Sequence, residues 1–174
     1  MKVLPPVECP DSHTIEASVT IRRPVGIVYA FYRDFNHLPS FLGDVTAIET
    51  IDPATTRWTI QAPLKMALRW TVRVTEEVEN ALIRYETVAH PRRRIRWDIH
   101  FTPGPGPNET TVREAMHAPL GALGLELLAW MGKPAAKEVA ANLHRLKEVL
   151  ETGRVSDRSY AVPGKFPSSD PTTI

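Results

Sequence analysis

The chain contains seven apolar, strand-like segments but only one long amphipathic helix to cover the sheet that they would form. Neighbouring strands lie about 4.8 Å apart, so a sheet of this size spans roughly 34 Å. A helix with its side chains is only about 10 to 12 Å wide. Because one helix cannot cover such a sheet flat, we expect the sheet to bend around the helix, and interior space that side chains leave unfilled to form a ligand pocket.

Length and composition favour one domain with a real core. A chain of 174 residues can bury about 70 % of its unfolded surface. The formal charge of +1 gives no general attraction to nucleic acid or to an anionic membrane, so we expect no nucleic-acid partner. Cys9 is the single cysteine, which excludes an intrachain disulfide. With no signal-like or membrane-length apolar run, we expect a cytoplasmic protein.

Hydrophobic patterns place the strands in a meander. They predict strands at 14–21, 45–51, 57–61, 66–76, 81–88, 94–101 and 110–116. Two of these alternate cleanly and define a predicted inner face: Met66, Leu68, Trp70, Val72 and Val74, and Ile95, Trp97, Ile99 and Phe101. Their other faces are polar and predict a solvated outer side: Arg69, Arg73, Arg94, Arg96, Asp98 and His100.

The positions of proline residues and the spacing of apolar residues predict where the helices lie. Two short helices are predicted at 24–32 and 36–41, and a long one begins at Pro134. Its apolar stripe is Val139, Leu143, Leu146 and Leu150. Its polar side is predicted to carry Lys137, Glu138, Arg145, Lys147 and Glu148. We expect an N-terminal extension at 1–13, a domain at 14–153, and a mobile tail at 154–174.

Several short runs resemble the polyketide cyclase/dehydrase family. They are residues 17–25, 28–35 and 38–41, then Arg57-Trp58, Trp70 with Val72 and 75–77, and finally 101–103, 119–124 and 143–147. The resemblance covers residues 14–153. It implies the α+β helix-grip fold of the START-like (SRPBCC) superfamily: a curved seven-stranded antiparallel sheet around a long C-terminal helix, with two short helices after the first strand. It also implies a cavity, which in relatives receives lipids, sterols, polyketides or quinones. No catalytic motif of the family is present to transfer, and the triplet 92–94 is unlike the family's loop, which indicates a different entrance.

Large apolar side chains form the predicted ligand-binding wall. The set is Trp58, Met66, Leu68, Trp70, Tyr85, Trp97, Ile99, Phe101, Met116, Leu123, Leu127, Met131 and Leu143. Aromatic and sulfur-containing residues suit a flat apolar ligand, because they bury large areas and adapt in shape. The alternative is that they only pack the core, where their burial stabilises the fold without a ligand.

Glu114 is the candidate for polar chemistry. It shares strand parity with Val112 and Met116, which places its carboxyl toward the interior. A buried carboxyl needs a partner or a raised pKa, so Glu114 could orient a polar ligand group or move a proton as a catalytic residue. The alternative is that a bulge or a strand end turns it to solvent.

The remaining motifs either argue against a metal or nucleophile site or allow more than one role. The six histidines lack metal-ligand spacing, and no serine lies in a nucleophile elbow, so we expect no metal and no cofactor. The apolar segment 120–131 fits a core helix, a lid over the cavity, or a patch for transient membrane contact. The cluster Arg92, Arg93, Arg94 and Arg96 fits a solvated turn, or a docking site for an acidic carrier protein or a lipid headgroup.

The sequence therefore predicts a non-enzymatic protein that binds or transports a small hydrophobic ligand, such as a lipid, a polyketide or a quinone-like molecule. One alternative is a polyketide cyclase/dehydratase that acts in the same cavity, where positioning of the substrate would do much of the work. Another is a non-catalytic interaction module that uses the apolar segment 120–131 and the tail.

Overall fold

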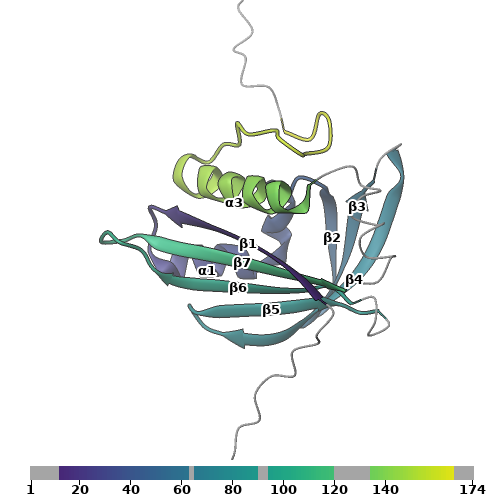
Figure 1. Cartoon of the computed structure of the whole chain (residues 1–174), viewed down its shortest axis with the longest axis horizontal. Coiled ribbons are helices and arrows are strands. Elements are labelled where there is room, and N and C mark those ends of the chain that lie inside the picture. The colour runs from purple at the N-terminus through teal and green to yellow at the C-terminus, as the bar shows by residue number, and fades with distance from the viewer. Residues whose placement is uncertain (1–11, 63–64, 90–93, 120–133, 167–174) are drawn as a thin grey trace, which may run out of the picture.

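A single curved sheet forms the framework of the molecule. The computed structural model describes residues 12–62, 65–89, 94–119 and 134–166. Its antiparallel sheet has seven strands in the order β1-β7-β6-β5-β4-β3-β2 (Figure 1). The strands are β1 (Ser12–Ile21), β2 (Val45–Asp52), β3 (Thr55–Gln61), β4 (Ala67–Val78), β5 (Leu82–Thr87), β6 (Arg96–Pro103) and β7 (Thr110–Pro119). The predicted meander is confirmed for β2 to β7, and β1 pairs with β7 at the far edge.

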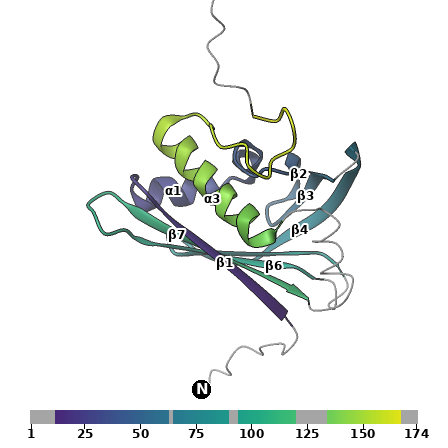
Figure 2. The ribbon, with the colours of Figure 1, turned by 45° about the horizontal axis from the view of Figure 1, so that its top comes forward.

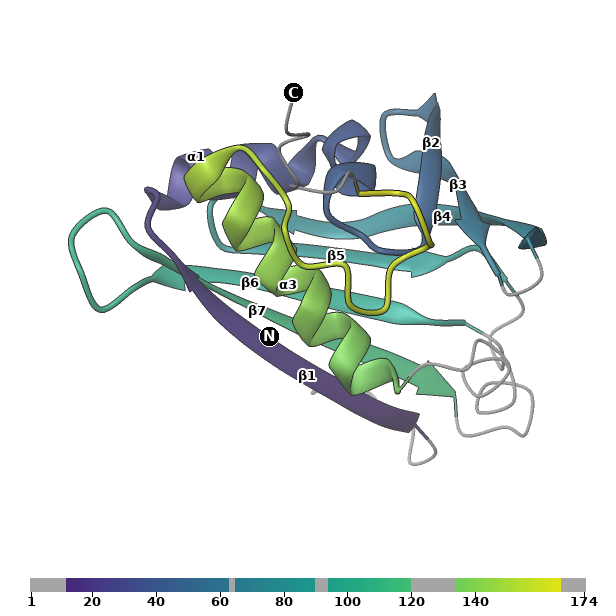
Figure 3. The same cartoon turned by 90° about the horizontal axis from the view of Figure 1, so that it is seen from above.

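The long helix α3 (Ala135–Thr152) lies across the concave side of the sheet, over β1 (Figures 2 and 3). It follows Pro134, which needs no hydrogen-bond acceptor for its nitrogen, and it ends at Gly153, whose φ of 74° is left-handed. Leu143 and Leu146, on the predicted apolar stripe, are 1 % and 0 % exposed. The predicted helix-grip fold is confirmed.

Two short helices follow β1 and pack on the same side of the sheet. Helix α1 (Val25–Arg33) and the 3₁₀ helix η1 (Phe35–Ser40) match the two predicted segments. The side chain of Asp34 accepts a hydrogen bond from Asn36 N at 3.1 Å, which starts the 3₁₀ turn. Both helices bury apolar side chains in the main core, among them Val28 and Leu38.

The prediction that Met66 points inward is wrong. Met66 is 47 % exposed and lies one residue before β4. Ala62 N donates to Met66 O at 2.7 Å, and Lys65 has a left-handed φ of 59°. The left-handed backbone of Lys65 therefore sets the direction of Met66, and the alternation of β4 does not extend to it.

Residues 154–166, here called the C-terminal segment, pack on the domain, although the composition predicts a mobile tail. Arg145 is fully buried. Its guanidinium donates from Nε to Phe41 O at 2.7 Å and from Nη1 to Ser159 O at 2.8 Å. The ring of Phe166 lies 5.3 Å from the same guanidinium. The segment runs back beside α3 (Figure 3), so these contacts order the part of the predicted tail that the structure describes.

Three charged residues that were predicted to be solvated are buried. Glu138 and Arg145 on α3 are 8 % and 0 % exposed, and the C-terminal segment covers Arg145. On the outer face, Asp98 is 7 % exposed, because Arg84, Arg96 and His117 surround its carboxylate at 2.7, 3.4 and 3.2 Å. Buried charge is tolerated at these sites because each side chain has oppositely charged or hydrogen-bonding neighbours.

Candidate functional site

Three large aromatic rings form the middle of the concave face. Tyr85 on β5 and Trp97 on β6 are register partners, and their rings stack with centroids 5.3 Å apart and planes 20° apart. Trp58 on β3 reaches across β4 to within 5.7 Å of the Tyr85 ring. The three rings are buried and pack against one another, so together they form a continuous apolar wall.

The end of the concave face near α1 is closed by aromatic packing. Phe35 meets Tyr85 edge to face at 5.4 Å, and Tyr32 meets Phe101 in the same way at 5.8 Å. The opposite end is less completely covered, since Leu68 and Trp70 on β4 are only partly buried.

The structure places the predicted wall residues in three groups. Those buried on the inner face or on α3 are Trp58, Tyr85, Trp97, Ile99, Phe101, Met116 and Leu143. Leu68 and Trp70 are partly buried, and Met66 is exposed and takes no part in the wall. The predictions for Leu123, Leu127 and Met131 lie outside the described residues.

Glu114 lies in the interior. It is 4 % exposed, and its neighbours on the adjacent strands are Ala17 on β1 and Ile99 on β6. Its Oε2 has no hydrogen-bond partner among the described residues. Burial, together with the charge of Glu138 on α3, raises the pKa of Glu114 to about 8. At neutral pH the Glu114 side chain is therefore mostly a neutral carboxylic acid.

A pair of buried tyrosine hydroxyls lies near this carboxyl. The hydroxyls of Tyr32 on α1 and Tyr85 on β5 are 3.0 Å apart and share a hydrogen bond. Burial raises the pKa of both, and the charge on Glu114 adds to the effect. Sequence analysis missed Tyr32, whose only signal was its place on the apolar side of a short helix. The interior thus contains an aromatic wall and three buried polar side chains.

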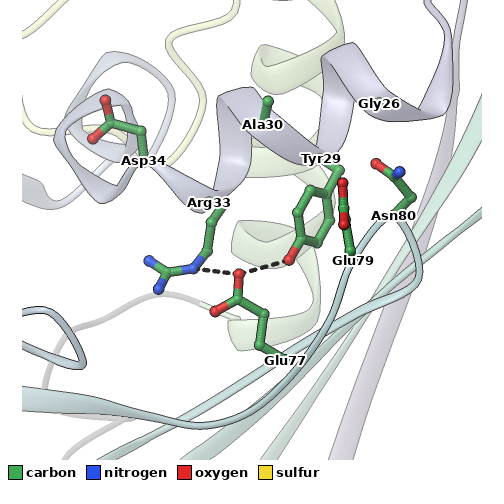
Figure 4. A pocket seen from close by; sticks show the side chains of 8 residues that line it. All are labelled: Gly26, Tyr29, Ala30, Arg33, Asp34, Glu77, Glu79 and Asn80. Atoms are coloured by element: carbon green, nitrogen blue, oxygen red, sulfur yellow. Dashed lines mark hydrogen bonds and ion pairs between the residues drawn. The ribbon is translucent and has the colours of Figure 1, made fainter.

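A separate groove lies on the outside of the grip, between α1 and the turn after β4 (Figure 4). It has a volume of about 830 Å³ and is lined by Gly26, Tyr29, Ala30, Arg33, Asp34, Glu77, Glu79 and Asn80. The hydroxyl of Tyr29 donates to Glu77 Oε1 at 2.7 Å, and Arg33 Nε lies 2.8 Å from the same oxygen. Burial opposes ionisation of Glu77, but these two contacts lower its pKa. Its charged lining makes this open groove a poor match for an apolar ligand.

The described residues hold no group of three or more histidine, cysteine or acidic side chains placed to bind a metal ion. Within the same part of the chain, no helix has the length and apolar character needed to cross a membrane. Both findings concern the described residues alone.

Comparisons with known proteins agree on one fold. The model of the family described as polyketide cyclase/dehydrase and lipid transport matches residues 12–151. A search of curated proteins finds no match. Similar solved structures include a Deinococcus radiodurans protein, with 23 % identity, a TM-score of 0.63, and coverage of 81 % of this chain and 99 % of that one. A START superfamily protein from Mycobacterium smegmatis has 13 % identity, a TM-score of 0.64, and coverage of 80 % and 97 %.

A protein from a biosynthetic pathway is also among the similar structures. It is the di-domain ARO/CYC StfQ from the steffimycin biosynthetic pathway, with 14 % identity, a TM-score of 0.63, and coverage of 81 % of this chain and 52 % of that one. At these identities the solved structures establish only the fold of this chain. The family model matches most of the length of the chain and therefore establishes its family.

Proposed function

We propose that this chain, which belongs to the polyketide cyclase/dehydrase and lipid transport family, binds a small hydrophobic molecule against the concave face beneath α3. The observation that carries the proposal is an aromatic inner wall together with the buried Glu114 carboxyl, whose Oε2 has no hydrogen-bond partner among the described residues. A wall that served only as core would gain nothing from Glu114, because an unpaired buried polar group is destabilising. A ligand with an apolar body and one polar group would use both features.

The wall supports a flat ligand of the lipid, polyketide or quinone-like type. The Tyr85 and Trp97 rings are nearly parallel, and Trp58 is tilted by 29° from Trp97. Partly buried Trp70 extends the aromatic surface toward the more open end. A carrier needs only such a surface and a route to it.

A cyclase/dehydratase is the second candidate. The observation that favours it is Glu114, whose neutral acid form near pH 7 could donate a proton to a bound substrate and take it back. Turnover of a poly-keto substrate by the purified protein would support this candidate, whereas saturable binding of the same substrate without turnover would support a carrier.

Dye binding to the folded protein tests the proposal. We expect an environment-sensitive apolar dye to bind at one saturable site, and native mass spectrometry of freshly purified protein to reveal a bound small molecule. Trp70→Leu removes an aromatic face from the wall and should weaken dye binding by about fivefold, in line with an aromatic contact worth about 1 kcal/mol. Ile51→Ala, which changes an exposed residue on β2, is the matched control. Absence of saturable binding by the folded wild-type protein would refute the proposal.

A further inference from the structure

Three polar side chains are in contact on the outer face of the sheet, opposite α3. They come from β1, β7 and β6, which are neighbours in the sheet (Figure 3). Thr14 Oγ1 lies 3.0 Å from Nδ1 of His117, and Nε2 of the same imidazole lies 3.2 Å from Asp98 Oδ2. A hydroxyl, an imidazole and a carboxylate are therefore linked in series across three strands.

The strand register produces this arrangement. Thr14 and His117 are register partners, so their side chains lie on the same face of the sheet. Asp98 pairs with Ala115, which is two positions from His117 on β7, so the contact between Asp98 and His117 is a diagonal one. Diagonal neighbours are within reach of long side chains, and the small side chain of Ala115 leaves room for the imidazole to lean toward the carboxylate.

Asp98 is held so that it can orient the imidazole. Its Oδ1 lies 2.7 Å from Arg84 Nε and 3.4 Å from Arg96 Nε, whereas its Oδ2 contacts His117. The two arginines thus occupy one carboxylate oxygen and leave the other to the imidazole. Because a carboxylate only accepts hydrogen bonds, Nε2 of His117 carries the proton, and Nδ1 is left to accept the proton of the Thr14 hydroxyl.

Exposure to solvent differs between the two ends of the series. The side chains of Asp98 and His117 are only 10 % and 22 % exposed, whereas Thr14 is exposed. A small molecule can therefore reach the Thr14 oxygen, while the imidazole and the carboxylate behind it are sheltered. A hydroxyl that donates to an oriented imidazole is the arrangement that activates serine and threonine as nucleophiles.

We propose that Thr14, His117 and Asp98 act as nucleophile, general base and positioning carboxylate in the hydrolysis of small activated acyl esters or thioesters. This inference goes beyond the proposed binding function and is independent of it, because it concerns the opposite face of the sheet. Thr14 is exposed on a sheet face, so the reactivity of the acyl group matters more than the shape of a large substrate.

The reaction has two steps. The Thr14 oxygen attacks the acyl carbonyl carbon, the Thr14 proton passes to Nδ1 of His117, and the bond to the leaving group breaks with its electron pair on the leaving group. Asp98 stabilises the imidazolium through Nε2–H. Water then attacks the acyl group on Thr14 with the same imidazole as base, which releases a carboxylic acid and restores the hydroxyl.

Hydrolysis of p-nitrophenyl acetate by the full-length protein tests the inference. The release of nitrophenolate is followed by absorbance, and protein quenched with acid is examined by tandem mass spectrometry for an acetyl group on Thr14. All measurements use a Cys9→Ser background, because a thiol also takes acetyl groups from this ester and Cys9 lies close to Thr14 in the sequence.

Three variants separate the proposed chemistry from a structural role of the same contacts. Thr14→Val should lower the rate of nitrophenolate release at least about tenfold, since a positioned base contributes about 100-fold or more and other histidines supply a background. His117→Gln should lower it as much, although the amide can still hydrogen-bond to both neighbours. Thr14→Ser keeps the hydroxyl and should keep the activity. Ser18→Ala is the matched control, because Ser18 is exposed on the same face of β1 but pairs with Arg113 instead of a histidine.

An acetyl group on Thr14, with activity lost in Thr14→Val and His117→Gln but kept in Thr14→Ser and Ser18→Ala, supports the inference. Equal release rates with and without Thr14→Val overturn it. Acetylation of His117 with none on Thr14 also overturns it, because the imidazole would then be the nucleophile. Mapping the acetyl group needs no substitution at these three residues, so a folding defect of a variant does not remove the test. Binding of an apolar dye, measured on the same samples, bears on the proposed binding function alone.

Discussion

Replacing Glu114 with Gln should stabilise the protein, and the gain should grow with pH. In the unfolded chain the Glu114 carboxyl has its ordinary pKa of 4.5, whereas in the folded protein burial raises that pKa to about 8. Near pH 7 the unfolded state is ionised and the folded state is mostly protonated. Since one pKa unit corresponds to about 1.4 kcal/mol, this mismatch lowers the free energy of unfolding by about 3 kcal/mol.

The pH dependence has a definite sign. Because the folded pKa is raised, the favourable contribution of protonated Glu114 is fully present below pH 4.5 and is lost as the pH rises through about 8. Gln is neutral at every pH and has nearly the same shape. We therefore expect Glu114→Gln to add less than about 1 kcal/mol near pH 5, about 3 near pH 7 and as much as about 5 above pH 8.

Urea unfolding of both proteins at about pH 5, 7 and 9 measures these differences directly, and the slope of each unfolding curve shows whether the transition remains comparable. For a chain of this size, a gain of about 3 kcal/mol corresponds to a rise in Tm of roughly 6 to 12 °C. Glu16→Gln, at an exposed position on β1, is the control and should change stability by no more than about 0.5 kcal/mol. A gain that does not change with pH, or a loss of stability at neutral pH, would show that Glu114 is ionised and paired in the folded state.

Three further substitutions test contacts elsewhere. Arg145→Met should lower the free energy of unfolding by about 3 kcal/mol or more and expose the C-terminal segment to proteolysis, because the carbonyl of buried Phe41 and the carbonyl of Ser159 lose their donor; exposed Arg158→Met should do neither. Gly43→Ala should destabilise by about 1 to 3 kcal/mol in urea unfolding, since a Cβ there would lie 2.8 Å from a guanidinium nitrogen and 3.1 Å from a backbone oxygen. Tyr29→Phe removes the hydrogen bond to Glu77 and should lower Tm by an amount equivalent to about 1 kcal/mol, without changing dye binding on the concave face.

The sheet and its buried face could be predicted because they depend on local periodicity. Residues 95, 97, 99 and 101 alternate with polar residues, and a one-residue shift would move all four to solvent, so the pattern defines both the strand and its inner side. The stripe of α3 is equally local, because residues three and four apart lie on one side of a helix. The inward direction of Glu114 follows from the same rule.

Contacts between segments that are distant along the chain produce no periodic pattern in the sequence. Arg145 belongs to the polar side of an isolated helix, and it is buried only because the C-terminal segment, with Phe166, returns to cover it. The Tyr32–Tyr85 pair joins residues 53 positions apart, on elements of different type. Met66 differs for a local reason, since a left-handed residue beside it ends the alternation one position early.

Two buried acids in this fold differ in a way that bears on function. Asp98 on the outer face lies within 3.4 Å of two arginines and a histidine, so the fold supplies what that carboxylate needs. Glu114 on the inner face has an oxygen without a partner among the described residues and remains protonated near neutral pH instead. A molecule that accepts a hydrogen bond from Glu114 would bind only the folded state, and binding would therefore raise its stability. The stabilisation expected of Glu114→Gln and the stabilisation expected from such a ligand thus have the same origin, a buried carboxyl with an oxygen that lacks a partner among the described residues.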